Sequence, residues 1–565
     1  MTEELMWTAK ITHSDMLFTW LRLSWTPLDI IFLVAFVVLL ALTEYRPIWL
    51  RVKKKKKKTS VNKLTFKDIP GPRPSLPILG TRWIFSSFGP YKMHKIHEAY
   101  RDMFEEYGKV VKEETLWNHP VVNVMDRKSI EEVLMHYSKY PLRPPTEVTV
   151  YYRKSRPDRY TNLGIVNEQG EIWHNLRSVL TAELTSTKTV MRFLPEQNAV
   201  TDDFISLLRA TRNENNEVHS FEEFTNRMGL EVTCTLILGR RMGFLNDKVD
   251  DLAAKLAAAV KVHFCASRDT FYGLPFWKAF PTKAYRQFAE SEEVIYEIIS
   301  DLVEKSQQEE NDTCQTSDVQ SVFVSILKAK GLDERDKKAA IIDFIAAGIR
   351  TFGNTLVFLM YLIAKHKNVQ QQLHEEVSNL VPRRSSVTPD ALKNATYLRA
   401  CITEAFRVLP TAPCVARILE TEMDICGYHL NPGTVVLCHT WMACMQEVNF
   451  ENASTFKPER WLTEGSRKNN YLVAPFGSGR RMCPGKRFME QELQIVLAKV
   501  GSQKTNSDKS AMFYFPPNQT PSIHLVILFQ IVSEFYLEFD EDLELMFEFL
   551  LAPQGPVKLR LIDRE

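Results

Sequence analysis

The spacing of apolar residues along the chain predicts a mainly helical body. The longest helical pattern covers residues 337–366 and is mostly apolar, so we expect this helix in the core. Short strands are expected near residues 121–124 and 422–437. The pattern therefore indicates a mainly α protein with a small β-rich region.

The first fifty residues differ from the rest in hydropathy. A run of Ile, Phe, Leu, Val and Ala over residues 28–42 is interrupted only by Asp29, and its length is close to that of a bilayer-spanning helix. Arg51 and the lysines at 53–58 follow directly, which favours a cytoplasmic body. We expect a membrane anchor in residues 1–50. A cleaved mitochondrial targeting peptide is the alternative, but such peptides are poor in acidic residues, and this segment carries five.

A proline-rich stretch follows the basic run. It reads Pro70-Gly71-Pro72-Arg73-Pro74 and continues with Pro77 and Gly80. Prolines at this density cannot continue a helix. Residues 51–80 are therefore predicted to form a basic tether and a stiff hinge, and residues 81–565 a single large catalytic unit.

The helical pattern of the C-terminal region is interrupted once. A helix with an apolar face ends at Val500, where a polar stretch begins, and removal of residues 500–530 joins Lys499 to Ile531 in the same helical period. Valine can be encoded by a codon that begins with GT, and glutamine, which stands at 530, by CAG. We hypothesise a retained intron at 500–530, and a genuine surface insertion is the alternative.

Composition excludes some classes of function. The net charge of the 565-residue chain is +2, so there is no global case for nucleic-acid binding. The nine cysteines show no spacing typical of a zinc site or a disulfide framework. A reducing environment is the natural interpretation.

One cysteine lies in a glycine-bracketed loop near the C-terminus. The loop reads Pro475-Phe476-Gly477-Ser478-Gly479-Arg480-Arg481-Met482-Cys483-Pro484-Gly485. Gly479 and Gly485 are expected to allow close approach and positive φ values. A helix N-terminus after the loop, with Arg481 and Lys486 nearby, favours the thiolate of Cys483. Such a loop can hold a thiolate against a large flat cofactor, or it can be a turn with a buried thiol.

The ten-residue pattern from Phe476 to Gly485 resembles the signature of the cytochrome P450 family. The resemblance implies the P450 fold and haem b as the cofactor, with Cys483 as the axial ligand of the haem iron. It also implies that Phe476 and Arg481 lie at the cofactor. The implied reaction inserts one oxygen atom of dioxygen into a C–H bond, with electrons from NADPH through a redox partner.

Further motifs extend the resemblance. Trp173 and Arg177 lie four residues apart and share one face of a helix. An ordinary amphipathic pair would look the same. In the family this pair reaches a haem propionate, which a guanidinium binds well, and Arg417 matches another propionate contact.

The central helical stretch carries the candidate oxygen-activation residues. Gly348 and Thr351 lie three apart on one helix face, and core packing alone requires neither. By resemblance, they accommodate dioxygen and relay protons. The usual acidic residue before the threonine is replaced by Arg350. Asn354 or ordered water could take over its role in proton delivery.

Glu404, Arg407 and Arg460 match the family's Glu-Arg-Arg network. A surface ion pair at i,i+3 is the plain alternative and would contribute only a few tenths of a kcal/mol. Together with Arg460, upstream of the cysteine loop, the pair is expected to lock that loop. This role supports haem binding and is not catalytic.

Finer resemblance concerns the substrate. Lys486-Arg487 resembles the mitochondrial-type branch of animal P450s, and stretches such as Arg143-Pro-Pro-Thr-Glu-Val resemble arthropod members that hydroxylate ecdysteroids. An ecdysteroid substrate is therefore expected. Another steroid or lipophilic substrate is the first alternative. A haem-thiolate steroid-binding or sensor protein without monooxygenase activity is the second.

The electron donor must be a separate protein, because the chain carries no flavin or nucleotide motif. The expected anchor favours the flavoprotein P450 reductase of the endoplasmic reticulum. The branch resemblance favours a ferredoxin with its reductase at the mitochondrial inner membrane. Lys365, Lys367, Lys486 and Arg487 could bind an acidic redox protein, although ordinary solvated side chains fit them equally well.

Overall fold

The computed structural model describes most of the expected catalytic unit. The described residues are 31, 64–182, 184, 186, 189, 193–246, 251–312, 321–380, 394–463, 471–486 and 535–563. Five expectations lie outside them: the anchor in residues 1–50 (residue 31 apart), the basic run at 53–58, the helix after the cysteine loop, Arg487 as a docking residue, and the insertion at 500–530.

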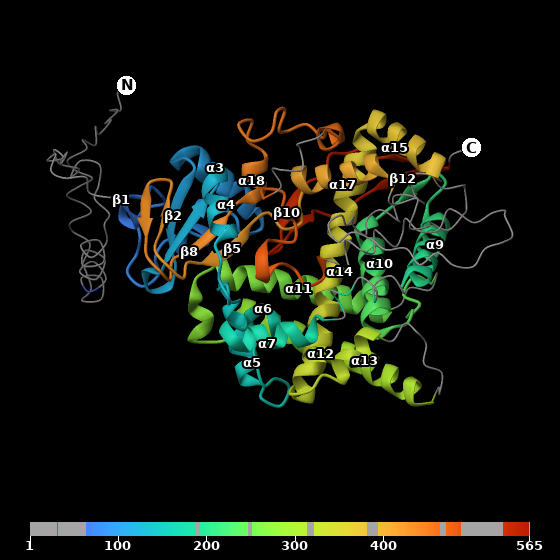
Figure 1. The fold of residues 1–565 in the computed structure, drawn as a ribbon, viewed down its shortest axis with the longest axis horizontal. Helices are drawn as coiled ribbons and strands as arrows, with labels where there is room; N and C mark the ends of the chain where they lie inside the picture. Colours follow the sequence, from blue (N-terminus) through green and yellow to red (C-terminus); the bar gives the residue numbers. More distant parts are fainter. Residues whose placement is uncertain are drawn as a thin grey trace, which may run out of the picture.

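The helices form the larger part of the molecule. The strands before residue 440 lie mainly at the left in Figure 1, and those after residue 534 lie at the centre and right, among the helices. The helices are α3 (Ile96–Tyr107), α4 (Arg127–Met135), α5 (Glu147–Ser155), α6 (Gly164–Asn167), α7 (Gly170–Leu180), α9 (Leu194–Thr211), α10 (Phe221–Leu238), α11 (Asp251–Tyr272), α12 (Lys283–Asp312), α13 (Ser321–Leu327), α14 (Glu334–Lys365), α15 (Lys367–Leu380), α17 (Thr396–Val408) and α18 (Thr440–Cys444).

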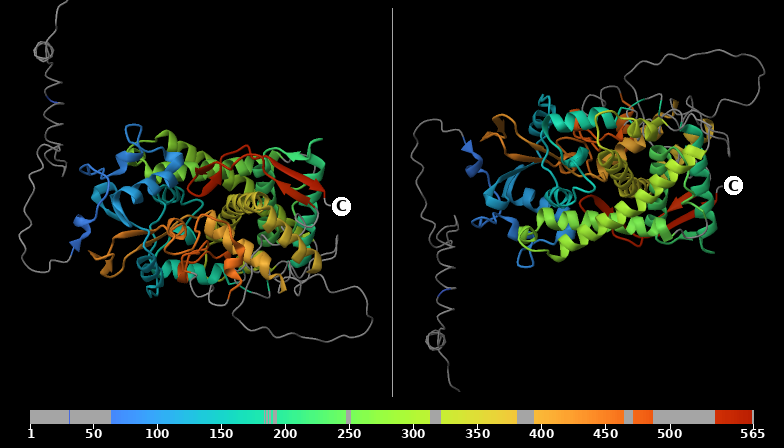
Figure 2. Two further views of the ribbon diagram at one scale, coloured as in Figure 1. Left: turned by 90° about the horizontal axis from the view of Figure 1, so that it is seen from above. Right: turned by 90° about the horizontal axis from the view of Figure 1, so that it is seen from below.

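Helix α14 is the central core helix, as its apolar pattern predicts. It runs through the helical part of the molecule in all three views (Figures 1 and 2), with α10, α11 and α12 packed against it. Among the described residues, α14 alone is long and apolar enough to cross a bilayer. Because 61% of its most apolar window is buried inside the protein, its hydrophobicity is explained by core packing.

Glycines bring α14 and α10 into close contact. A Cβ on Gly348 of α14 would lie 2.2 Å from Thr233 Oγ1 of α10, and a Cβ on Gly229 of α10 would lie 2.7 Å from the Ile349 carbonyl oxygen. Neither position has room for a side chain. The crossing of the two helices therefore depends on glycine at both sites.

The described residues also form four small sheets. The strands are β1 (Leu64–Thr65), β2 (Val110–Glu114), β3 (Pro120–Val124), β4 (Glu217–Val218), β5 (Val415–Ile418), β6 (Met423–Ile425), β7 (Tyr428–Leu430), β8 (Val435–Cys438), β9 (Phe535–Glu538), β10 (Leu545–Phe547), β11 (Leu551–Pro553) and β12 (Leu559–Asp563). The sheet orders are β2-β3-β8-β5, β1-β7-β6, β4-β12-β9 and β10-β11. The strands expected near residues 121–124 and 422–437 are confirmed.

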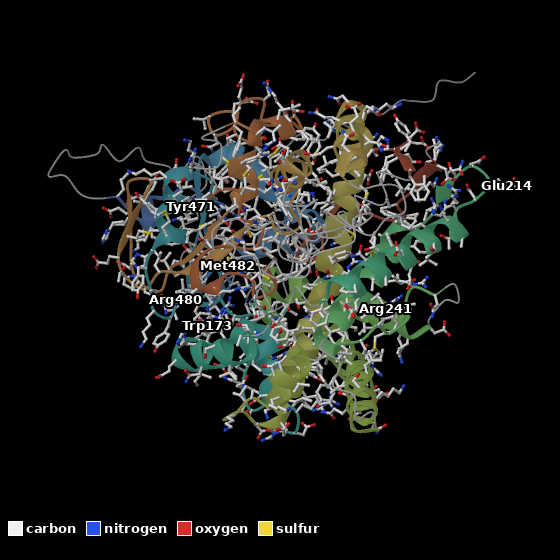
Figure 3. All side chains as sticks on the ribbon, turned by 45° about the vertical axis from the view of Figure 1, so that its right-hand side comes forward. Trp173, Glu214, Arg241, Tyr471, Arg480 and Met482 are labelled. Atoms are coloured by element: carbon white, nitrogen blue, oxygen red, sulfur yellow. The ribbon has the colours of Figure 1, made fainter. Side chains whose placement is uncertain are left out.

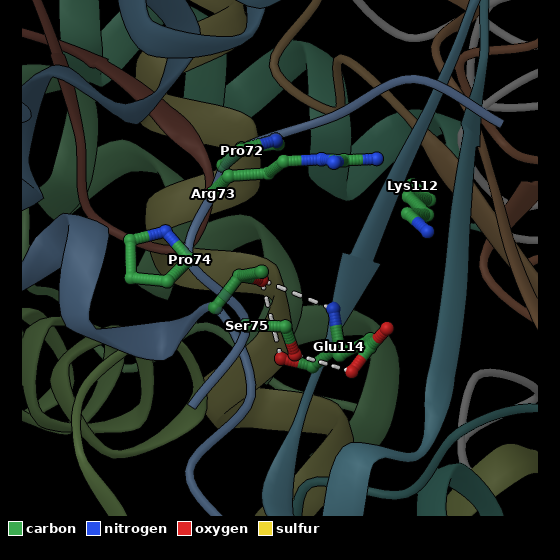
Figure 4. Close-up of a pocket in the computed structure, with 7 residues that line it drawn as sticks. Pro72, Arg73, Pro74, Ser75, Lys112 and Glu114 are labelled. Carbon is green, nitrogen blue, oxygen red and sulfur yellow. Dashed lines mark hydrogen bonds between the residues drawn. The ribbon is translucent and has the colours of Figure 1, made fainter. Parts of the chain in front are cut away.

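The proline-rich hinge lies along strand β2 (Figure 4). The Lys112 N–H donates to the Pro70 carbonyl oxygen at 2.8 Å, and the Ser75 hydroxyl donates to Glu114 Oε2 at 2.5 Å. The cavity drawn in Figure 4 measures about 10 Å³, room for no more than about one water molecule. The hinge is therefore a packed connection.

The described C-terminal segment, residues 535–563, packs in the core. Phe535 and Leu537 of β9 are fully buried. The Gln370 side chain of α15 bonds both backbone groups of Leu537, donating at 3.1 Å and accepting at 2.7 Å. This segment therefore belongs to the same core as the central helices.

Candidate functional site

The cysteine loop is a tight turn built on two glycines with positive φ. Gly477 has φ +73° and Gly479 has φ +68°, values that only glycine adopts easily. The turn lets the Cys483 N–H donate to the Phe476 carbonyl oxygen at 2.8 Å. The expectation of a positive φ at Gly485 is wrong, since its backbone lies outside that region. A Cβ there would lie 3.7 Å from Cys483 Sγ, in ordinary contact.

Several groups act on the Cys483 thiol. The side chain is exposed in the protein alone. Burial is the largest effect and raises the pKa of Cys483, while the N–H groups of Gly485 and Lys486 and the guanidinium groups of Arg177 and Arg143 lower it. Arg177 and Arg143 thus take the place that the sequence assigned to Arg481 and the Lys486 side chain.

Helix α7 brings Trp173 and Arg177 to the cysteine loop. The Arg177 guanidinium donates to the Met482 carbonyl oxygen at 2.6 Å. The Arg481 guanidinium carbon lies 3.9 Å from the centre of the Trp173 ring. Figure 3 shows Trp173 beside the segment that carries Met482. The two residues therefore share one face of a helix and meet the loop, as their spacing predicts.

Arginines hold the loop through backbone carbonyl groups. Arg481 donates to the carbonyl oxygens of Pro141 at 2.8 Å and Glu168 at 2.7 Å. Arg417 of β5 donates to the Ser478 carbonyl oxygen at 2.8 Å. These bonds fix the loop between α7 and the sheet that contains β5.

The same arginines form a concentration of positive charge. Burial, together with the charges of Arg143, Arg177 and Arg417, lowers the pKa of Arg481 to about 9. Among the described residues, none of these four guanidinium groups forms an ion pair with a carboxylate. The buried Trp173 Nε1 likewise finds no acceptor in the described part of the chain. The site therefore fits a flat cofactor with an anionic edge, such as haem with its two propionates.

Arg143 is the member of this cluster that sequence reasoning missed. Arg143 begins a stretch that resembles other members of the family. No sequence motif or helical spacing, however, predicts that it lies near Cys483. Its backbone accepts a bond from the Gln169 side chain at 2.8 Å, and Gln169 also accepts from Arg481 at 2.9 Å. The contact is tertiary and leaves no local signal.

On the other candidate element, α14, the hydroxyl of Thr351 donates to the Ala347 carbonyl oxygen at 2.6 Å. The expectation that core packing does not require Gly348 is wrong, because a Cβ there would lie 2.2 Å from Thr233 Oγ1 of α10. The expected role of Gly348 in accommodating dioxygen stays a prediction. The Asn354 amide donates to the Leu551 carbonyl oxygen at 3.0 Å, so it holds the C-terminal hairpin. Arg350 forms an ion pair with Glu548.

The structure brings Glu404, Arg407 and Arg460 together. Glu404 and Arg407 of α17 are completely buried and bond through both carboxylate oxygens, at 2.8 and 2.9 Å. Arg460 Nε donates to Glu404 Oε1 at 2.9 Å. Arg407 also donates to the carbonyl oxygens of Cys444, Ala453 and Thr455.

The network binds residues 453–460, which precede the cysteine loop. Helix α17 also contacts the loop itself, through a pair of aromatic rings. Phe406 of α17 packs edge-on against Phe476 of the loop, with ring centres 5.7 Å apart. Phe476 also supplies the carbonyl that accepts the Cys483 N–H. Phe476 therefore links the buried network to the cysteine.

A model of the family described as Cytochrome P450 matches residues 70–500 of the chain. The chain belongs to the cytochrome P450 family. It is accordingly a haem-dependent monooxygenase that receives electrons from NAD(P)H through a redox partner. The cluster of arginines around Cys483, which form no ion pair with a carboxylate of the described residues, agrees with this membership.

Similar P450 proteins include ecdysone 20-monooxygenase of Drosophila melanogaster, which is 46% identical over 512 residues, 88% of this chain and 88% of the relative. Cytochrome P450 302a1, mitochondrial, of the same organism is 31% identical and covers 77% of this chain and 88% of its own length. The mitochondrial 1,25-dihydroxyvitamin D(3) 24-hydroxylase of Mus musculus is 25% identical over 76% and 82% of the two chains.

Proposed function

We propose that this P450 hydroxylates an ecdysteroid and converts ecdysone to 20-hydroxyecdysone. The observation that carries the proposal is the 46% identity to an ecdysone 20-monooxygenase over 88% of both chains. Identity at this level extends over the whole catalytic body and is not limited to the cysteine loop.

The proposed roles at the cofactor follow from the geometry of the cysteine loop. Cys483 would hold the haem iron through its thiolate, and Arg177, Arg417 and Arg481 would balance the charge of the propionates, with the Trp173 indole N–H as a further donor. A thiolate-ligated haem supplies the oxygen chemistry by donating electron density that favours O–O cleavage. The protein holds this group, excludes water and aligns the substrate.

Thr351 and Gly348 are proposed to form the distal side of the site. The Thr351 hydroxyl already bonds a helix carbonyl, and it can exchange that bond for one to a water molecule, which would let it pass a proton. Gly348 keeps α14 close to α10. The turn that carries Thr351 is therefore held in place by glycine packing.

For the electron donor we propose a mitochondrial ferredoxin with its reductase, and for the location the mitochondrial inner membrane. Two of the relatives are named as mitochondrial proteins. The basic residues considered for docking are partly engaged within the chain: Lys365 Nζ lies 2.9 Å from Asp542 Oδ1, and Lys367 Nζ lies 3.8 Å from Glu538 Oε1. A ferredoxin would have to compete with these carboxylates for both lysines.

Turnover of ecdysone tests the proposed function. Purified holoprotein with NADPH and a mitochondrial ferredoxin system is expected to form a product heavier than ecdysone by one oxygen atom, detected by mass spectrometry. The flavoprotein P450 reductase replaces the ferredoxin system in a parallel reaction. Absence of the heavier product with both donors would refute the monooxygenase proposal for ecdysone.

We further propose that residues 500–530 are an unspliced intron. The family match ends at residue 500, and Phe535, the first described residue after the cysteine loop segment, is buried. Trypsin cleaves after Lys499, so the native protein is expected to yield a peptide that begins Ile531-Val532-Ser533-Glu534. A tryptic peptide that contains Phe513-Tyr514-Phe515-Pro516 would show instead that the insertion is present.

A further inference from the structure

One segment of the chain starts and ends at the same side chain of the cysteine loop. The Arg481 guanidinium donates to the Pro141 carbonyl oxygen at 2.8 Å, at one end of the segment. It also donates to the carbonyl oxygens of Ile165 at 3.4 Å and Glu168 at 2.7 Å, at the other end. We call residues 142–164, which lie between these ends, the flap. The flap contains helix α5, which lies below α6 and α7 in Figure 1.

The base of the flap is bound to the cysteine site. Arg143 of the flap carries one of the two guanidinium groups that lower the pKa of Cys483. Gln169 fixes the backbone of Arg143, because its side chain accepts from the Arg143 N–H at 3.3 Å and donates to the Arg143 carbonyl oxygen at 2.8 Å. The Thr146 N–H donates to Asn167 Oδ1 at 2.8 Å. The position of Arg143 near the cysteine therefore depends on the position of the flap.

A carboxylate of helix α12 holds the outer part of the flap. Glu293 accepts from the Tyr152 hydroxyl at 2.5 Å and pairs with Arg159 at 2.7 Å. It also pairs with Arg156. All three donors belong to the flap, so one side chain of α12 binds it at three points. The Glu293 side chain is 33% exposed, and salt therefore weakens these contacts.

A second carboxylate holds the flap to helix α14. Arg153 of the flap is buried, and its guanidinium donates to Asp343 Oδ2 at 3.0 Å and also to Asp343 Oδ1. Gly164, where the flap ends, has φ +78°, and a Cβ there would lie 2.2 Å from Arg153 Nη1 and 2.9 Å from Asp343 Oδ2. The pair therefore needs glycine at this position. We call Glu293 and Asp343, with their partners in the flap, the latch.

The apolar side chains of the flap belong to a small cluster that is separate from the main core. The members of this cluster are Val148, Tyr152 and Tyr160 of the flap with Ala266, Trp277, Phe288 and Ala339. The main core forms a different and much larger cluster. A segment with its own small core and partly exposed ion pairs can open without unfolding of the whole protein. The flap can therefore open as a unit, with Arg481 at its hinge.

Movement of the flap would act directly on the proposed cofactor site. Its hinge bonds are made by Arg481, which is proposed to balance a propionate, and the flap itself carries Arg143. Opening of the flap would therefore displace one arginine of the site and release another from its backbone partners. A large rigid cofactor can leave a folded protein only where a segment moves aside, and the flap is a segment whose movement also removes contacts to the cofactor.

We propose that the flap is a clasp that retains the haem, and that its latch on α12 and α14 sets the rate at which haem is lost. The inference rests on the proposed place of the haem at Cys483. It concerns retention of the cofactor and goes beyond the proposed hydroxylation. Loss of haem requires no redox step. The iron–sulfur bond breaks, and the thiolate keeps its electron pair and takes up a proton from water.

The test is Glu293→Gln in the holoprotein, with transfer of haem to an excess of apomyoglobin followed by absorbance. The amide keeps the shape of the side chain and removes the charge that Arg156 and Arg159 share. We expect haem transfer to be at least about threefold faster, as loss of partly exposed ion pairs shifts an opening equilibrium by about this factor. The wild-type rate should rise with ionic strength, and the rise should be smaller in the variant.

Glu304→Gln is the matched control. Glu304 also belongs to α12 and also pairs with a cation of α14, because it lies 2.9 Å from Lys338 Nζ, but this pair lies outside the flap. Its haem transfer is expected to match the wild type. Deuterium exchange of residues 147–163 should be faster in Glu293→Gln and unchanged in Glu304→Gln. Exchange of α10, in the main core, should be unchanged in both.

Three results would overturn the proposal. The first is a wild-type rate of haem transfer in Glu293→Gln. The second is equal acceleration in Glu304→Gln, because any loss of charge between α12 and α14 would then have the same effect. The third is faster binding of ecdysone in stopped-flow measurements with an unchanged rate of haem transfer, which would assign the flap to entry of the substrate.

A second variant keeps the proposal testable if Glu293→Gln does not fold. Lys278, which follows α11, lies 2.7 Å from Glu147 of α5, so Lys278→Gln removes another contact of the flap. Haem transfer is expected to be about twofold faster, and a wild-type rate overturns the proposal. Failure of the proposed cofactor site is distinguishable, since the wild type itself would then lack the absorbance of a thiolate-bound haem.

Discussion

Cys483→Ser is expected to abolish conversion of ecdysone, with product formation reduced by at least about a thousandfold. A serine hydroxyl does not ionise near neutral pH and cannot donate electron density to iron as a thiolate does. The backbone bond from residue 483 to the Phe476 carbonyl oxygen does not involve the side chain, so the loop should keep its shape. Product mass and the visible absorption spectrum of the haem are the measurements.

The matched control is Cys426→Ser, which changes an exposed cysteine in a turn between β6 and β7. It is expected to retain the wild-type spectrum and turnover. A Cys483→Ser protein that still hydroxylates ecdysone would mean that another residue holds the iron, and the assignment of the loop as the cofactor site would fail.

Glu404→Gln is expected to destabilise the protein by about 3–5 kcal/mol and to lower its haem content on purification. The substitution removes the charge that balances the fully buried Arg407. Arg460, the Trp461 indole N–H and the Lys457 N–H also donate to this carboxylate. An amide has one acceptor oxygen and cannot satisfy all these donors. Urea unfolding and the ratio of haem absorbance to protein are the measurements.

An exposed pair with the same spacing provides the control. Lys95 and Glu98 also lie three residues apart and approach to 3.2 Å, but the Glu98 side chain is 41% exposed. Glu98→Gln is expected to change the free energy of unfolding by less than about 1 kcal/mol. If Glu404→Gln were as mild as this control, the buried network would not be what supports the cysteine loop.

The sequence predicted the central helix and the network well because both have local signals. Residues 337–366 repeat with a helical period, and the helix observed is Glu334–Lys365. Glu404 and Arg407 lie three apart on one helix, so their pairing needs no tertiary information. Arg460 joined them only through the resemblance, since more than fifty residues separate it from Glu404.

Other features left no signal that a single sequence can show. The glycine at 348 could be interpreted as space for a ligand, whereas the structure shows that a Cβ there would meet Thr233 of α10. Arg350 was identified as a departure from the family pattern, but its partner Glu548 lies 198 residues further along the chain. Neither helical nor strand periodicity extends over such a separation.

The sequence by itself therefore determined the family, the helices that carry the site, and the cysteine expected to hold the iron, because motifs and periodicity act over a few residues. Only the tertiary structure decided which charges meet. It placed Arg143 with the other arginines around Cys483, and it brought Glu548 to Arg350 beside Thr351. The reason is that burial and pairing of charges depend on the packing of separate elements, and this packing depends on contacts spread over the whole chain.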